Sequence, residues 1–401
     1  MRKSLIALAF GTFALGITEY VMMGILPYIA NDFHVSISEA GYFISAYALG
    51  VCAGAPIVAV FCRKWPLKNI LYLLVSVMLF ASLCMTLCPL PEGEAQGMGW
   101  QFWLMMFFRF LGGMPHGAFF GVGSIVADRL SKGNGSVFAV AVMCSGMTIA
   151  NLVGIPLGTF LTGLISWRLV FGFATLWNAV TMIAVVNWIP RMDALPDNGV
   201  KGEFRFLKTL APWLLILATI FGNGGVFCWY SYISPTLTKL GGVPESWMTL
   251  MMALAGAGMV IGNMFGGKLS DKFGPGHTCR SLETMIFVSL VLIALTAQWM
   301  WCSIPLMFIT AGGLFALSSP QQLLLLRYSR GGELMGGAMI QLAFNLGNAV
   351  GAYMGGLPID ESNPQTYHYS ACIGAVLAFF GVICYAIFCK RYEKRLARLK
   401  K

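Results

Sequence analysis

The sequence predicts an all-α polytopic membrane protein with twelve transmembrane helices arranged in two pseudo-symmetric six-helix bundles. Of its 401 residues, 58% are hydrophobic and 10% are charged, and the mean hydropathy is +0.75. Soluble domains carry about 25% charged residues, so this chain has too few to cover a surface that faces water. The apolar residues also occur in blocks of about 20–25, the length that crosses a ~30 Å hydrocarbon core at ~1.5 Å per residue.

Polar residues and Pro/Gly clusters divide the apolar sequence into twelve segments. In the first half we expect helices near 5–29, 40–61, 69–88, 101–127, 136–164 and 169–190. In the second half we expect them near 209–235, 246–267, 281–301, 305–326, 333–357 and 369–389. The first segment is longer than the apolar region of a signal peptide and lacks a small-residue cleavage site, so we expect it to be a retained span.

The basic residues predict the orientation of these spans. If both termini are cytoplasmic, the outer loops hold only Arg168 and Lys239, and Arg109 lies within a span. All other lysines and arginines then fall on the inner side, as the positive-inside rule requires. We therefore expect a multi-pass protein of the cytoplasmic (inner) membrane, with both termini in the cytoplasm. The basic tail is expected to contact membrane lipid and not nucleic acid.

The two halves resemble each other in sequence. We expect an N-terminal bundle over 1–190, a central cytoplasmic loop over 191–208, and a C-terminal bundle with the basic tail over 209–401. The motif ILPYI at 25–29 matches ISPTL at 233–237, and Gly50 and Gly54 recur 208 residues later as Gly258 and Gly262. NLVGIPLG in the fifth segment likewise matches NAVGAYMG in the eleventh. Matches in the same order predict a parallel internal repeat, an architecture found in transporters.

Four stretches of the first half carry a family resemblance. They are TEYVMMGILPYIANDFHVSISEAGYFISAYALGVCAGAP (18–56), RFLGGMPHGAFFGVGSIVAD (109–128), GMTIANLVGIPLGTFL (146–161) and SWRLVF (166–171). Together they resemble the major facilitator superfamily, and within it the proton-linked drug and sugar efflux branch of arabinose-efflux-like permeases. The resemblance implies proton-coupled antiport of a small molecule such as a sugar or drug by alternating access. It also implies a monomer.

Two motifs of that family are partly retained in this sequence. Its inner-loop motif Gly-x-x-x-Asp-Arg-x-Gly-Arg is absent from the first-half loop VFCRKWPLKN, but the second-half loop GGKLSDKFG keeps Gly267, Asp271 and Gly274. The antiporter motif of the fifth helix is represented by Gly154, Pro156 and Gly158, with the proline displaced by one residue. We expect both groups of residues to serve gating or helix packing.

Two opposite charges lie inside apolar spans at similar estimated depths. Glu19 lies a little over halfway along the first span, and Arg109 lies in the fourth. A charge at mid-span costs roughly 2.5–3.5 kcal/mol, so we predict that the two form a pair or share a hydrogen-bond network. Three interpretations stay open: the pair joins two helices, Glu19 carries the coupling proton, or Glu19 binds substrate directly. The position 208 residues after Glu19 is Phe227, which favours coupling.

His116 follows Arg109 by two helical turns and is either a proton relay or a neutral hydrogen-bonded histidine. Other polar, aromatic and methionine side chains within the spans are candidates for a substrate cavity. The candidates are Tyr20, Met23, Asn151, Asn223, Phe227, Tyr230, Gln341 and Asn345. The amides among them are alternatively hydrogen-bonded links between helices, and for Asn151 and also Asn348 packing is the favoured interpretation.

The residue patterns favour transport over catalysis. There is no nucleotide-binding loop in a suitable context, so transport energy is expected from an ion gradient, with H⁺ as the coupling ion. The eleven cysteines are scattered without zinc-like spacing, and we expect no metal, no cofactor and no enzymatic activity. The alternative within the same fold is a proton-linked uptake symporter. A receptor and an intramembrane hydrolase are disfavoured, because the inner loops are short and no catalytic set accompanies His116.

Overall fold

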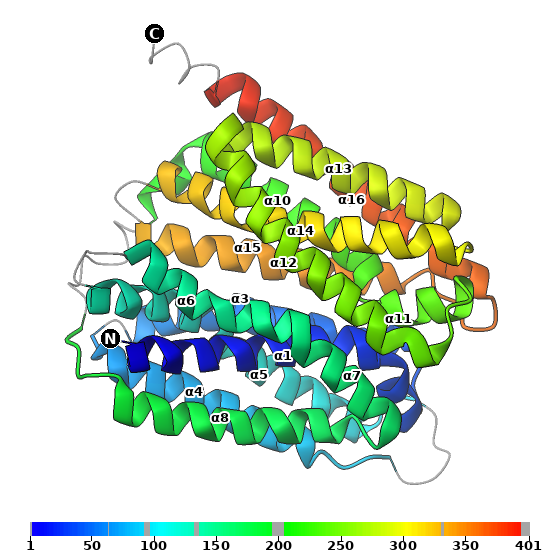
Figure 1. The fold of residues 1–401 in the computed structure, drawn as a ribbon, viewed down its shortest axis with the longest axis horizontal. Helices are drawn as coiled ribbons and strands as arrows, with labels where there is room; N and C mark the ends of the chain where they lie inside the picture. Colours follow the sequence, from blue (N-terminus) through cyan, green and yellow to red (C-terminus); the bar gives the residue numbers. More distant parts are fainter. Residues whose placement is uncertain are drawn as a thin grey trace. The chain divides into compact units, whose positions relative to one another are not determined.

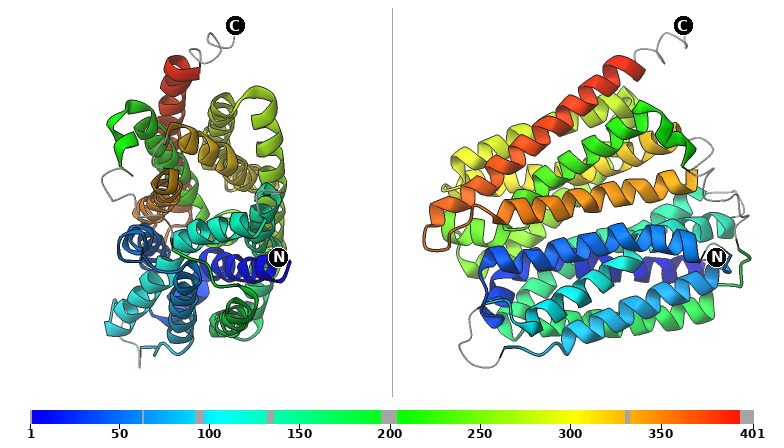
Figure 2. Two further views of the ribbon diagram at one scale, coloured as in Figure 1. Left: turned by 90° about the vertical axis from the view of Figure 1, so that its left-hand side faces the viewer. Right: turned by 180° about the vertical axis from the view of Figure 1, so that it is seen from behind.

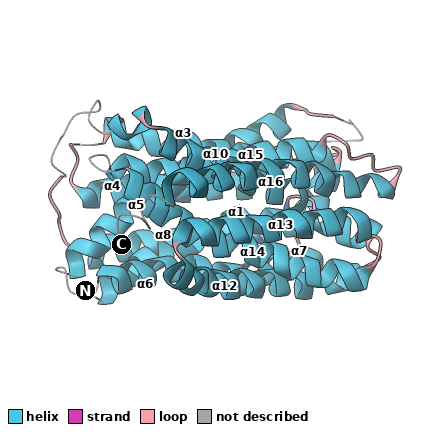
Figure 3. Ribbon diagram, turned by 90° about the horizontal axis from the view of Figure 1, so that it is seen from above, coloured by secondary structure: helices cyan, strands magenta, loops and turns pink. Residues whose placement is uncertain are grey.

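The computed structural model describes residues 2–62, 64–91, 97–131, 136–194, 204–329 and 333–393. Throughout these ranges the regular structure is helical and contains no strand (Figure 3). The described chain contains 11 helices that are long and apolar enough to cross a membrane. It divides into two compact units, Met1–Asn198 (unit 1) and Gly199–Lys401 (unit 2). Residues 195–203 of the expected central loop and 394–401 of the basic tail lie outside the described residues.

Unit 1 consists of six membrane-length segments (Figure 1). They are α1 (Arg2–Asp32), α2 with α3 (Ile37–Ala40 and Tyr42–Phe61), α4 (Leu67–Thr86), α5 (Trp100–Ser131), α6 with η1 and α7 (Ser136–Ile149, Ala150–Gly154 and Ile155–Leu164), and α8 (Arg168–Trp188). In the fifth segment, η1 is a π-helical turn that ends two residues before Pro156. Proline has no N–H to donate within a helix, and the wider π turn accommodates that loss.

Unit 2 also has six such segments. They are α10 (Leu210–Tyr230), continued by α11 and η3 (Ile233–Pro235 and Thr236–Leu240), then α12 (Met248–Phe273), α13 (Pro275–Thr296), α14 (Met300–Tyr328), α15 (Glu333–Gly356) and α16 (His368–Phe388). Within this unit, α10 packs against both α15 and α16, as the green, orange and red helices of Figure 2 show.

The helices pair in the same way inside each unit. In unit 1, α1 packs against α6, α3 against α5, and α4 against α8. In unit 2, the corresponding pairs are α10 with α15, α12 with α14, and α13 with α16. Numbered as spans of each half, these are first with fifth, second with fourth, and third with sixth. This shared pairing is the structural counterpart of the sequence matches between the halves.

Glycines permit the closest of these contacts. A Cβ added at Gly54 of α3 would overlap the carbonyl oxygen of Met114 in α5. A Cβ added at Gly262 of α12 would overlap the carbonyl oxygen of Gly312 in α14 in the same manner. Because these two positions are 208 residues apart, the repeated glycines hold equivalent helix pairs at backbone contact in both units.

The ninth segment differs most from its expected bounds. We expected a helix over 281–301, whereas α13 runs from Pro275 to Thr296. Gly274 has a φ of 84° and separates α12 from α13, and Pro275 occupies the first turn of α13, where its missing N–H costs nothing. The polar residues from 276 onwards therefore belong to the helix and not to the preceding loop.

Candidate functional site

The candidate site of unit 1 consists of four buried polar side chains from three helices. Glu19 comes from α1, Tyr47 from α3, and Arg109 and His116 from α5. Arg109 is 0% exposed and Glu19 is 6% exposed. A buried charge is stable only when it is paired and hydrogen-bonded, so the contacts within this cluster determine its chemistry.

Glu19 and Tyr47 converge on one nitrogen of His116. The Tyr47 hydroxyl lies 3.0 Å from His116 Nδ1, and Glu19 Oε2 lies 3.7 Å from the same atom. The imidazole also stacks on Phe120 with ring centroids 5.3 Å apart. Neutral Nδ1 accepts a hydrogen bond from the tyrosine, whereas protonated Nδ1 donates to an acceptor such as the carboxylate. The geometry thus allows one proton to pass between Glu19 and His116 after a small movement.

Arg109 is held by the main chains of two neighbouring helices. Its Nε donates to the carbonyl oxygen of Phe43 in α3 at 3.1 Å, and its Nη1 donates to that of Thr18 in α1 at 2.8 Å. The guanidinium carbon lies 4.7 Å from the centroid of the Tyr47 ring, a cation–π contact. Nη2 has no hydrogen-bond partner among the described residues. The guanidinium is therefore bound to the carbonyl group of Thr18, the residue before Glu19, and it interacts electrostatically with the Glu19 carboxylate.

The sequence predicts that Glu19 and Arg109 form a pair or share a hydrogen-bond network. The structure brings Glu19, Arg109 and His116 into one cluster. In it, Arg109 donates to two backbone carbonyl groups, and the Glu19 carboxylate lies within ion-pair distance of His116. Tyr47 was not anticipated. Its available signal was its position one turn before Gly50, on the face of α3 that approaches α5.

Glycines of α3 and α5 place Tyr47 beside His116. A Cβ at Gly113 of α5 would overlap the carbonyl oxygen of Tyr47, and one at Gly50 would overlap that of Phe110. The two backbones can touch only because both positions lack side chains. His116 lies one turn beyond Gly113, so its ring faces the Tyr47 hydroxyl across this contact.

The glycines of the antiporter motif pack against the same stretch of α1. Gly154 lies against Ile17, and Gly158 lies against Val21, the residues two before and two after Glu19. Larger side chains at either glycine would push α1 away and disturb the position of the carboxylate. Pro156 is buried between them in the first turn of α7.

Three remaining cavity candidates also belong to unit 1. Tyr20 and Met23 are buried in α1. Asn151 is buried in η1, and neither its amide nitrogen nor its oxygen has a hydrogen-bond partner among the described residues. Because buried amides are normally paired, Asn151 stays a candidate for a solute contact.

Comparison with known proteins assigns the family. Residues 8–352 match the model of the Major Facilitator Superfamily. This chain belongs to the Major Facilitator Superfamily. It is thus a multi-pass membrane transporter for a small molecule, and it is not an enzyme.

Three relatives cover nearly the whole transporter. The putative transporter AraJ of Escherichia coli K12 is 40% identical over 397 residues, covering 99% of this chain and 97% of the relative. A chloramphenicol resistance protein of Streptomyces lividans is 28% identical and covers 88% of each chain. A probable sugar efflux transporter of Helicobacter pylori strain J99 is 22% identical, covering 95% of this chain and 94% of the relative.

A solved structure shares the fold. The crystal structure of a D-xylose-proton symporter superposes with a TM-score of 0.72 at 13% sequence identity, covering 94% of this chain and 96% of the other. The all-α transporter fold with twelve spans predicted from the sequence is confirmed by this likeness together with the family match.

The cavity candidates of unit 2 lie on α10 and α15 of the transporter. Asn223 Nδ2 lies 3.5 Å from Asn348 Oδ1, which links the two helices, whereas Asn345 Nδ2 donates to the carbonyl oxygen of Gln341 in its own helix at 3.0 Å. Phe227 and Tyr230 are buried, with ring centroids 6.2 Å apart.

The inner-loop motif of unit 2 is only partly described. A Cβ at Gly267 would meet nothing within 4 Å, so this glycine is not required by close packing. Gly274 forms the left-handed turn between α12 and α13. The side chain of Asp271 lies outside the described side chains, so the expected gating role of this motif stays a prediction.

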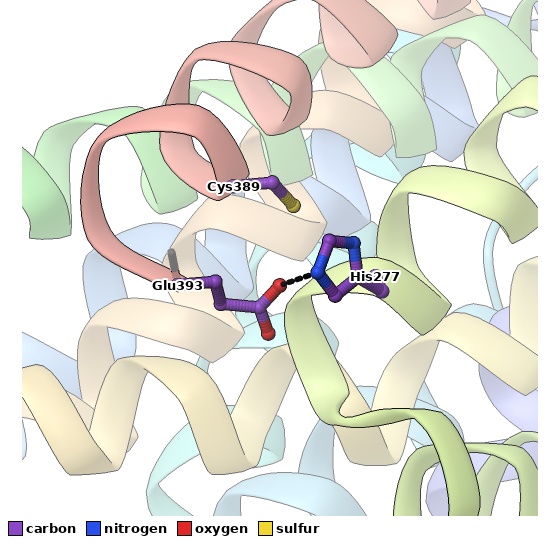
Figure 4. A group of neighbouring side chains, drawn as sticks. All are labelled: His277, Cys389 and Glu393. Carbon is purple, nitrogen blue, oxygen red and sulfur yellow. Dashed lines mark ion pairs between the residues drawn. The ribbon is translucent and has the colours of Figure 1, made fainter. Parts of the chain in front are cut away.

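A second polar cluster joins the start of α13 to the C-terminal end of the described residues (Figure 4). Glu393 of η6 (Cys389–Glu393) accepts a hydrogen bond from the Gly276 N–H at 2.8 Å, and its other oxygen lies 3.2 Å from His277 Nε2. Cys389 completes a group whose possible ligand atoms lie within 4.8 Å of one another. The carboxylate already caps the positive end of α13, so we interpret the group as a structural contact between α13 and η6 and not as a metal centre.

Proposed function

We propose that this transporter is a proton-coupled antiporter that exports a small molecule such as a sugar or a drug. The observation that carries the proposal is the burial of Glu19 within ion-pair distance of His116, near the Arg109 guanidinium, which is hydrogen-bonded to the main chain of α1. The names of two relatives, a chloramphenicol resistance protein and a probable sugar efflux transporter, support the substrate class and the direction.

Glu19 is the proposed coupling acid. Burial favours its neutral form, and the fixed charge of Arg109 favours the carboxylate. A small change in water access or the arrival of a substrate therefore shifts the balance between the two forms. His116 then supplies a second position for the proton at the atom closest to Glu19, and Tyr47 keeps that nitrogen oriented.

Alternating access would convert this titration into transport. The two six-helix units would rock about a substrate site near the membrane midplane, as transporters with internal repeats do. A proton that crosses a membrane potential of 100 mV supplies about 2.3 kcal/mol. Unit 1 contributes the coupling acid, and the proposed substrate contacts include Tyr20, Met23 and Asn151 of the same unit.

Reconstitution into liposomes tests the proposal. With an acidic lumen, we expect the wild-type protein to accumulate substrate, with chloramphenicol and a panel of pentoses as the first probes. Glu19→Gln is expected to abolish this accumulation while retaining exchange of labelled for unlabelled substrate at equal pH. Glu245→Gln removes an exposed carboxylate of unit 2 by the same substitution, and it should behave as the wild type.

Two results would contradict the proposal. If Glu19→Gln still accumulates substrate in an acidic lumen, Glu19 is not the coupling acid. If the wild-type protein accumulates substrate only when the external solution is acidic, the chain is a symporter. The fold does not decide between the directions, because a symporter shares it.

A further inference from the structure

Unit 2 contains a buried acid outside the candidate site described above. Glu283 lies on α13 and is 0% exposed. Neither of its carboxylate oxygens has a hydrogen-bond partner among the described residues. Glu283 is also absent from the ion pairs of the described part of the chain. Among the described residues, a carboxylate at this position would therefore have neither a hydrogen bond nor an ion pair to stabilise its buried charge.

The neighbouring helices leave room for this carboxyl group. A Cβ added at Gly222 of α10 would collide with the Glu283 carboxylate, and a Cβ at Gly381 of α16 would lie 2.9 Å from Oε1. The side chain thus occupies a slot between α10, α13 and α16 that depends on a glycine from each of the two facing helices. Filling the slot with an acid and not with an apolar side chain requires a compensating use for the acid.

Among the described residues, the groups that interact electrostatically with Glu283 carry no positive charge, and Arg280, the cation three residues before it on α13, is exposed. The electrostatic neighbours of Glu283 are Cys279 on the same helix and Cys384 and Tyr385 on α16. Helix α10 has no charged residue, and Gln321 of α14 donates to the Tyr385 hydroxyl at 2.8 Å. Glu393 of η6 lies at the start of α13, where it caps Gly276 about two turns before Glu283.

We propose that Glu283 is a second proton-binding site of this transporter, located in unit 2 and occupied in this conformation. The neutral acid avoids the cost of a bare charge in the slot. When α10, α13 and α16 separate enough to admit water, the carboxylate becomes solvated and the proton is released. The proposal does not depend on the role of Glu19, because the two acids belong to different units.

The position of Glu283 along α13 indicates which side receives the proton. It lies eight residues after Pro275, or about 12 Å along the helix at ~1.5 Å per residue. With the orientation expected from the basic residues, the start of α13 is cytoplasmic. Proton exchange at Glu283 is then with the cytoplasmic side.

Infrared difference spectroscopy of the purified full-length protein tests this inference. A protonated carboxyl group has a C=O stretching band that the carboxylate lacks. We expect this band at neutral pH in the wild type, in Glu19→Gln and in Glu245→Gln, and its loss in Glu283→Gln. In the wild type the band should disappear reversibly as the pH is raised.

Two outcomes would overturn the inference. A spectrum of Glu283→Gln that matches the wild type shows that Glu283 carries no proton, and a Glu283 band that persists at every pH shows a sealed structural acid. If Glu283→Gln does not fold, Glu283→Asp keeps the acid in a shorter side chain and should displace the band. If the band of folded Glu283→Asp is unchanged, the inference that Glu283 carries the proton is also wrong.

Discussion

Replacing Arg109 by lysine tests the geometry of the unit 1 cluster most directly. The guanidinium donates from separate nitrogens to Phe43 of α3 and Thr18 of α1, and it lies over the Tyr47 ring. A lysine keeps the charge but offers one nitrogen in place of the planar fork, so it cannot reproduce both bonds from that position. A hydrogen bond to a charged group contributes about 1.5–3 kcal/mol to stability. We therefore expect Arg109→Lys, which loses one of the two hydrogen bonds, to lower the free energy of unfolding by this amount.

This loss is large enough to measure by thermal unfolding. For domains near the size of unit 1, about 1 kcal/mol shifts the Tm by roughly 2–4 °C, so we expect Arg109→Lys to unfold about 3–12 °C lower. The cysteines allow a direct assay, because Cys62, Cys88 and Cys228 are free and buried and become accessible to a thiol-reactive dye on unfolding.

The control uses the same substitution at an exposed position. Arg280 of α13 is exposed, and Arg280→Lys is expected to leave the Tm unchanged. If Arg109→Lys unfolds at the temperature of that control, Arg109 does not hold α1 and α3 through two separate bonds. Arg109→Met should lower the Tm further, because it removes both bonds and leaves Glu19 without its fixed cation.

Three further substitutions follow from the contacts of the described residues. Tyr47→Phe removes one hydrogen bond to His116, so we expect it to lower the free energy of unfolding by about 0.5–1.5 kcal/mol. It should also slow pH-driven transport more than exchange. Equal slowing of both would contradict the proposal that Tyr47 orients His116. Gly54→Leu should prevent the contact of α3 with α5 and abolish the monodisperse peak in size-exclusion chromatography, whereas Gly267→Ala, which meets open space, should not. Glu393→Ala removes the cap of α13 and should lower the free energy of unfolding by about 1 kcal/mol. An unchanged Tm would show that the contact between Glu393 and α13 does not stabilise the protein.

The helices were predictable because a single physical requirement determines them. Every span must cross the same hydrocarbon thickness, so length and hydropathy were sufficient for the fold class. Boundaries were less predictable where polar residues enter a helix end. The start of α13 depends on the left-handed φ of Gly274 and on Pro275, which act through backbone geometry and not through hydropathy.

The same boundary explains why Glu283 was missed. With the helix expected to start at 281, Glu283 would lie near the membrane surface, where an acid requires no explanation. The structure places it two turns inside α13 and buries it completely. Glu19 and Arg109 were found because each interrupts a long apolar run. Tyr47 was not found, because an aromatic residue in a span gives no such contrast.

The side-chain contacts of the cluster could not be deduced from spacing. The groups that Arg109 contacts depend on the rotation of α1, α3 and α5 about their axes. The rotation of α3 and α5 is set by the glycine contacts of Gly50 and Gly113 with the facing backbone. A glycine pattern indicates that two helices touch, but it does not specify which neighbouring side chain then reaches which atom.

The two buried acids occupy positions that the internal repeat does not relate. The residue 208 positions after Glu19 is Phe227, and the residue 208 positions before Glu283 is Val75, which is buried in α4. A hybrid gene with two copies of the first half would therefore encode two Glu19 sites and no Glu283, and a hybrid of the second half would encode the reverse. Separate expression of the two halves, followed by their reassembly, would allow the glutamates of one half to be isotopically labelled without those of the other, so that the ionisation of Glu19 and of Glu283 could be followed separately.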